Sequence, residues 1–125
     1  YVIANRYTSA NAVHQLSKLP REEWDEFLKW LWDFEFSRLC LPVPDATIYL
    51  ELPPVLSLSL VKSRSAETGR KMDIHELDTS YMEKCYDAAL FSCKALGWER
   101  IKCYEGDTIR TREDIFEEII KRLKM

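Results

Sequence analysis

Glycine is scarce in this chain of 125 residues. The sequence holds only three, Gly69, Gly97 and Gly106, and none stands in a GxxxxGK(S/T) run. Such a run builds the loop whose backbone amides cradle the phosphates of a nucleotide. Residues 1–125 are therefore not expected to form a triphosphate-binding loop by themselves.

The sequence also lacks a basic block and a long apolar run. Its 18 basic and 21 acidic residues give a net charge of −3 and are spread along the chain. Without a basic patch we expect no nucleic-acid partner. No apolar stretch approaches the ~20 residues of a membrane span, so we expect no membrane association and a cytoplasmic protein.

Cysteine pairs with metal-ligand spacing are missing too. The four cysteines lie far apart, with no CxxC pair and no nearby histidine: Cys40, Cys85, Cys93 and Cys103. Zinc sites require such clusters. We expect reduced core thiols and no metal bound by these residues.

The apolar pattern predicts strands that alternate with helices. Short β-branched or alternating runs predict strands, and apolar residues at steps of three and four predict helices. The strands are expected at 2–4, 47–52 and 99–104, and the helices at 9–19, 21–39, 53–64, 78–96 and 111–124. The long gaps permit right-handed crossovers, so we expect an α/β fold with a parallel sheet and flanking helices, whose ligands lie beyond the carboxyl ends of the strands. The apolar character of 47–52 predicts burial on both faces of its strand.

A polar cluster follows the first predicted strand. Asn5-Arg6-Tyr7 ends this strand, and Asn11, His14 and Gln15 stand on the next helix. The planar fork of an arginine binds phosphate oxygens through two hydrogen bonds. This cluster suits a phosphate next to a polar ring, although Arg6 is equally suited to a surface salt bridge.

Residues 65–77 have little periodicity and several charges, which predicts a surface loop. Cations and carboxylates alternate here and just before it, at Arg64, Arg70, Lys71, Asp73 and Glu76. The loop could close over an anion, or it could be a solvated linker.

Taken in order, these segments resemble the thymidylate kinase family. The resemblance rests on Asn5-Arg6-Tyr7, on Asn11 with Gln15, on Leu-Pro-Val-Pro-Asp at 41–45, and on Asp73-Ile74-His75-Glu76. It spans nearly the whole chain. It implies a three-layer α/β/α fold like that of P-loop nucleoside monophosphate kinases, with residues 1–125 as the C-terminal portion of one kinase domain and 65–77 as its lid.

The resemblance implies phosphoryl transfer from ATP to dTMP, and it assigns the acceptor side of the site to the first cluster. Arg6 would hold the acceptor phosphate. Asn11 would contact the thymine ring, helped by Gln15, and His14 would lie beside the sugar. Asn5 stands where the family has an aspartate, and an asparagine neither accepts a proton nor supplies charge near Mg²⁺.

The resemblance assigns the ATP side of the site to the predicted loop at 65–77. By the same resemblance, Arg70 is the lid arginine that reaches the transferring phosphoryl group, and Arg64 lies where the ATP base can rest on a guanidinium face. Asp73 and Glu76 would order the closed lid or contact the sugar. The ligands of ATP and Mg²⁺ would lie mainly in an upstream P-loop region, and the family also suggests a homodimer.

Three further expectations follow. The P-loop strand of the family lies between the strands at 2–4 and 47–52, so residues 1–125 alone are expected not to fold natively. A related kinase with another nucleoside or nucleotide substrate remains an alternative. So does a non-catalytic α/β module that binds a partner through an aromatic helix carrying Trp30 and Trp32.

Overall fold

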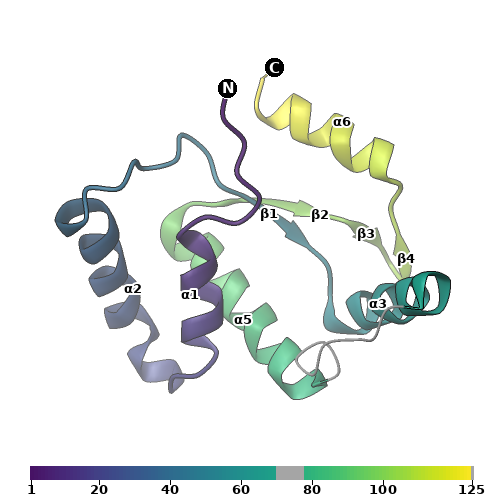
Figure 1. Ribbon diagram of the computed structural model, residues 1–125, viewed down its shortest axis with the longest axis horizontal. Coiled ribbons are helices and arrows are strands. Elements are labelled where there is room, and N and C mark those ends of the chain that lie inside the picture. The colour runs from purple at the N-terminus through teal and green to yellow at the C-terminus, as the bar shows by residue number, and fades with distance from the viewer. Residues whose placement is uncertain (70–77, 125) are drawn as a thin grey trace. The chain divides into compact units, whose positions relative to one another are not determined.

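A computed structural model describes residues 1–69 and 78–124 of the chain. The contacts divide it into two compact units, and each is described by itself. The first unit comprises Tyr1–Asp45 with Lys84–Gly97, and the second comprises Ala46–Glu83 with Trp98–Met125. Helix α5 (Thr79–Leu96) contributes to both units (Figure 1).

The first unit is helical. It contains α1 (Ser9–Leu16), the short 3₁₀ helix η1 (Arg21–Glu23), α2 (Trp24–Trp32) and the π-helix η2 (Asp33–Arg38). Figure 1 shows α1 and α2 side by side, in agreement with their contacts. The predicted helix over 21–39 is therefore present, but its last turn is widened into a π-helix. The core of this unit consists of buried apolar side chains from α1, α2 and α5: Ala12, Leu16, Trp24, Leu28, Leu31, Ala88, Ala89 and Cys93.

The strand predicted at 2–4 is wrong for this structure. Residues 1–4 form no regular element, and Val2 and Ile3 are 99% and 91% exposed. A strand needs a hydrogen-bonded neighbour, and none of the described residues pairs with this segment. Its β-branched composition alone was not sufficient to form a strand.

The second unit holds a small parallel sheet. Strand β1 (Ile48–Glu51) pairs with β2 (Glu99–Lys102) in parallel, with Ile48 opposite Glu99 and Glu51 opposite Lys102. The prediction of parallel strands with flanking helices, and hence of a mixed α/β protein, is confirmed to this extent. The expected burial of both faces of β1 is wrong, because Leu50 is 50% exposed while Glu51 is buried.

Helix α3 (Pro54–Thr68) begins at the predicted proline but extends beyond the predicted end. It stops at Gly69, whose φ of 67° is the left-handed conformation that glycine adopts without strain. Residues 65–68 of the predicted loop are thus helical, and residues 70–77 lie outside the described part of the chain. At the start of α5, Asp78 accepts a hydrogen bond from the Tyr81 amide at 3.1 Å and so caps the helix.

A hairpin that the sequence pattern did not predict follows β2. Strands β3 (Tyr104–Glu105) and β4 (Thr108–Ile109) pair in antiparallel fashion across Gly106, which has a φ of 57°. The Gly-Asp pair between two short apolar runs is a turn signal of this kind. The predicted strand at 99–104 is therefore two strands with different partners.

The four cysteines are free, as expected, but they are not all in the core. Cys93 and Cys103 are buried, Cys85 is half-buried and Cys40 is exposed. Burial is the main reason that the pKa of the Cys103 thiol is raised.

None of the described helices is long and apolar enough to cross a membrane.

Helix α6 (Arg112–Arg122) closes the chain and is fixed at its first turn. Thr111 accepts a hydrogen bond from the Asp114 amide and so caps the helix. Just before it, the Arg110 guanidinium donates to Asp114 and Glu118 at 2.7 Å each and to the Lys102 carbonyl at 2.6 Å. Arg110 thus ties the helix to the end of β2.

This arginine should make the stability of the protein sensitive to acid. Its hydrogen bonds are the main reason that the pKa values of Asp114 and Glu118 are lowered. A carboxylate whose pKa is lower in the folded state stabilises the fold above its unfolded pKa and loses this contribution as the pH falls through the folded value. In urea unfolding of the full-length protein, the loss of stability in Arg110→Gln should therefore shrink below about pH 4. The exposed neighbour Arg112, replaced in the same way, should show no such shrinkage, and a constant deficit for Arg110→Gln would contradict this account.

Candidate functional site

Arg6 stands out by its backbone. Its φ of 66° is left-handed, a conformation that costs a residue with a Cβ roughly 1–2 kcal/mol. The residue is exposed, and its guanidinium makes no ion pair with residues 1–69 or 78–124. The salt-bridge interpretation of Arg6 therefore has no partner in the described structure. A strained residue that makes no ion pair with the described residues is a candidate for a functional role.

The three helical candidates share one side of α1. His14 and Gln15 stand three and four residues after Asn11, a spacing that places each of them beside Asn11 on the surface of a helix. Asn11 and Gln15 are exposed and His14 is half-buried, whereas Ala12 and Leu16 face the core. The structure thus places these candidates together on a helix that begins three residues after Arg6.

Asn11 has a partner that the sequence pattern did not identify. Its side-chain Nδ2 donates a hydrogen bond of 3.3 Å to Oε1 of Glu35. Glu35 is only 5% exposed and is the buried residue of the π-helix η2. The sequence did indicate that position 35 is buried. Positions 24, 28 and 31 are buried, and their helical periodicity continues to position 35 and not to position 34. Phe34, which the sequence pattern placed inward, is 37% exposed.

Hydrogen bonds join the two segments that flank the pair of Asn11 and Glu35. The Tyr7 hydroxyl donates to the Pro42 carbonyl at 3.0 Å, and the Leu41 amide donates to the Glu35 carbonyl at 3.0 Å. The polar cluster after residue 4 and the Leu-Pro-Val-Pro-Asp segment therefore meet within the first unit. Far apart in sequence, they form one local structure.

Of the four candidates on the donor side, Arg64 alone falls within the described residues. Arg64 is exposed on α3, in the second unit, and its carbonyl accepts a hydrogen bond from Thr68. Arg70, Asp73 and Glu76 lie outside the described residues. Their assigned roles stay predictions.

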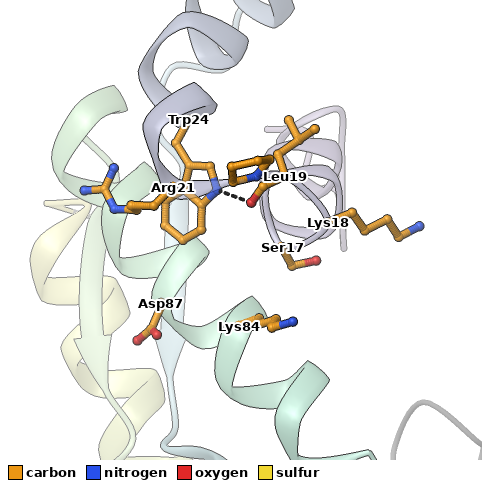
Figure 2. Close-up of a pocket in the computed structure, with 8 residues that line it drawn as sticks. Ser17, Lys18, Leu19, Arg21, Trp24, Lys84 and Asp87 are labelled. Carbon is orange, nitrogen blue, oxygen red and sulfur yellow. Dashed lines mark hydrogen bonds between the residues drawn. The ribbon is translucent and has the colours of Figure 1, made fainter.

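A hollow of about 560 Å³ lies at the other end of α1 (Figure 2). The Arg21 guanidinium lies over the Trp24 and Phe91 rings, 4.8 and 4.2 Å from their centres, and Trp24 Nε1 donates to the Leu19 carbonyl at 3.1 Å. Cation–π contacts of this kind fix the loop between α1 and α2. None of the predicted site residues lines the hollow, whose lining consists of Ser17, Lys18, Leu19, Pro20, Arg21, Trp24, Lys84 and Asp87.

Comparison with known proteins finds one kind of relative. The chain is 29% identical over 98 residues to the thymidylate kinases of two strains of Mycobacterium tuberculosis, CDC 1551/Oshkosh and ATCC 25618/H37Rv. The chain is therefore similar to thymidylate kinases over most of its length. The match covers 78% of this chain and 45% of each relative, so the chain spans about half the length of the curated relatives it matches. No protein-family model matches the chain, and no solved structure gives a significant match.

Similarity to thymidylate kinases raises the question whether this chain could hold Mg²⁺. Among the residues that the structure describes, no three His, Cys, Asp or Glu side chains lie together as a metal site would require. Asn5, directly before Arg6, offers a neutral amide where a carboxylate would be the preferred ligand of this cation. The described residues therefore do not fit a Mg²⁺ site, and no chemical step is assigned to the metal here.

Proposed function

We propose that this chain is the C-terminal part of a nucleotide kinase domain that transfers the γ-phosphoryl group of ATP to dTMP and forms dTDP. The observation that carries the proposal is Arg6, exposed, without an ion pair in the described structure and held in a left-handed conformation three residues before α1. Similarity to thymidylate kinases over 98 residues supports the same assignment.

In this proposal Arg6 binds the phosphate of dTMP. Its backbone strain is compensated only when a ligand takes up the guanidinium, which can offer two parallel N–H groups to phosphate oxygens. Since Arg6 precedes α1, the phosphate lies near the start of this helix, and the rest of the nucleotide extends along the face that carries Asn11, His14 and Gln15. Asn11 and Gln15 contact the thymine ring, and His14 packs beside the deoxyribose.

In the reaction, an oxygen of the dTMP phosphate attacks the γ-phosphorus of ATP, and the bond between this phosphorus and the oxygen that links it to the β-phosphate breaks. The main tasks of the protein are to align the two nucleotides and to neutralise the charge that spreads over the transferring group. Arg6 holds the attacking phosphate, and Arg70, in the lid that the resemblance predicts, reaches the transferring group. Arg64 lies against the ATP base, and Asp73 with Glu76 orders the closed loop.

The proposal also includes parts outside residues 1–125. A P-loop upstream of this chain would hold the ATP phosphates and would bring with it the ligands for Mg²⁺, which neutralises phosphate charge when bound. The whole enzyme would be a cytoplasmic homodimer with the three-layer fold of P-loop kinases.

One observation favours a different class of function. Trp30 and Trp32 are 55% and 43% exposed, and the Trp30 ring stacks on Phe34 with centroids 5.2 Å apart. An exposed aromatic surface of this kind suits a protein partner. A non-catalytic module that binds a partner through α2 and η2 is therefore the second candidate.

An activity assay separates these candidates. The full-length protein is incubated with ATP and, in turn, with dTMP, dUMP, CMP and deoxynucleosides, and ADP release is followed. We expect turnover with a preference for dTMP. Turnover with a preference for another acceptor would assign a related kinase instead, and binding of a protein partner without any turnover would support the non-catalytic module.

A further inference from the structure

Burial of the Glu35 carboxylate is energetically unfavourable. Glu35 is 5% exposed, on the buried stripe of α2 and η2 that otherwise consists of Trp24, Leu28 and Leu31. Glutamate is almost never fully buried unless it is paired, and the side-chain partner that the structure shows is the neutral amide of Asn11. An apolar residue would serve a purely structural role at this position as well or better. The π-helical turn that carries Glu35 is also a form of helix found frequently at functional sites.

The contact fixes the orientation of the Asn11 amide. A carboxylate only accepts hydrogen bonds, whereas an amide has a donor end, Nδ2, and an acceptor end, Oδ1. Nδ2 lies 3.3 Å from Glu35 Oε1, so Oδ1 is the end of the amide that this contact leaves to accept a hydrogen bond, on a residue that is exposed on α1. A flipped amide would place two acceptors against each other in a buried setting, which is unfavourable.

We infer that Glu35 is a positioning residue that turns the acceptor end of Asn11 toward the substrate and thereby selects pyrimidines that carry a hydrogen on N3. The inference rests on the proposed function. Thymine and uracil present an N3–H donor between two carbonyl oxygens, whereas the N3 of cytosine is an acceptor. Asn11 Oδ1 accepts from the N3–H of thymine, but it faces the lone pair of cytosine, which leaves two acceptors unpaired.

A mutant cycle in the full-length protein tests this role. Glu35→Gln offers Asn11 a donor as well as an acceptor, so both amide orientations become possible. We expect the ratio of kcat/KM for dTMP over dCMP to fall about tenfold, mainly through KM for dTMP. The same substitution should change the ratio little when Asn11 is already alanine, because Glu35 acts through Asn11. Equal effects in both backgrounds would overturn the inference.

A double substitution that exchanges the positions of the acid and the amide should restore the preference for dTMP. In Asn11→Asp two carboxylates face each other and repel, which displaces the aspartate from the position of the wild-type side chain, so the preference for dTMP should be lost. Adding Glu35→Gln lets the new glutamine donate to the new aspartate, which still presents an acceptor to N3–H, so the preference should return. Glu26→Gln, at an exposed glutamate on the preceding helix α2, is the matched control and should leave the ratio unchanged. A double variant whose preference for dTMP is no higher than that of Asn11→Asp alone would contradict the inference.

A measurement on the ligand side does not depend on the folding of any variant. dTMP methylated at N3 should bind the wild-type protein about tenfold more weakly than dTMP, because it lacks the hydrogen that Asn11 accepts. Equal binding of the two ligands would refute the inference while leaving the proposed function intact. A wild-type protein that does not turn over dTMP would refute both.

Discussion

Replacement of Arg6 by glycine is expected to lower kcat/KM for dTMP in the full-length protein by about a hundredfold to a thousandfold, the usual effect of removing one donor to a charged reacting group. The same change should not destabilise the protein. Arg6 has a φ of 66° and no ion pair with a described residue, and glycine adopts this conformation without strain. Activity and thermal stability should therefore move in opposite directions, as expected where strain serves function.

Arg6→Ala separates the two effects. Alanine also removes the guanidinium but keeps the Cβ, so we expect the same loss of activity with a protein about 1 kcal/mol less stable than Arg6→Gly. Arg112→Ala, at the exposed start of α6, is the matched control and should retain activity. Steady-state kinetics and thermal unfolding of the three variants check this prediction. Unchanged activity in Arg6→Gly would remove the central residue from the proposed site.

Replacement of Arg70 by alanine is expected to slow turnover by tens to thousands of fold, roughly the range for a group that stabilises a transferring phosphoryl group. The effect should fall on kcat more than on KM for dTMP, because Arg70 is assigned to the transferring group and not to the acceptor. Arg70→Lys keeps the charge but loses the fork, so it should recover only part of the rate.

Lys62→Ala is a suitable control for this position. Lys62 is exposed on α3, eight residues before Arg70 in the sequence, and has no assigned role. Its replacement should leave kcat unchanged. An unchanged kcat in Arg70→Ala would return the segment at 65–77 to the alternative of a solvated linker, although the assignment of Arg6 would stand.

The elements that the sequence predicted well are those decided by local chemistry. Proline starts α3, Asp78 and Thr111 cap their helices, and the apolar run at 47–52 forms the strand that pairs in parallel with β2. Except for the pairing of β1 with β2, each of these features depends on neighbours within a few residues. Their existence could therefore be read from periodicity and capping residues alone.

The features that the sequence missed have two causes. Residues 2–4 have the composition of a strand but no neighbouring strand within the described chain, and composition could not decide this case because pairing depends on a distant partner. The other two features are local and carried weak signals. The hairpin of β3 and β4 consists of only two residues on each side of a Gly-Asp turn, and α3 runs on to Gly69 through four residues that polarity had assigned to a loop.

The candidate site shows the same division. Arg6 and the face of α1 were identifiable from residue types and spacing. The left-handed backbone of Arg6 and its lack of an ion pair with the described residues required coordinates. Glu35 was missed because a carboxylate is normally assigned to the surface. Its place in the stripe after Trp24, Leu28 and Leu31 was nevertheless visible in the sequence, and its contact with Asn11 gives that burial a reason.

The most direct test of the central claim is transfer of labelled phosphate from [γ-³²P]ATP to dTMP by the full-length protein, with wild type and Arg6→Gly compared at equal concentration. We predict labelled dTDP from the wild type and about a hundredfold or more less from Arg6→Gly, with both proteins folded. Absence of labelled dTDP from a folded wild-type protein, or equal yields from the two, would contradict the assignment of Arg6 to the acceptor phosphate of a thymidylate-phosphorylating kinase.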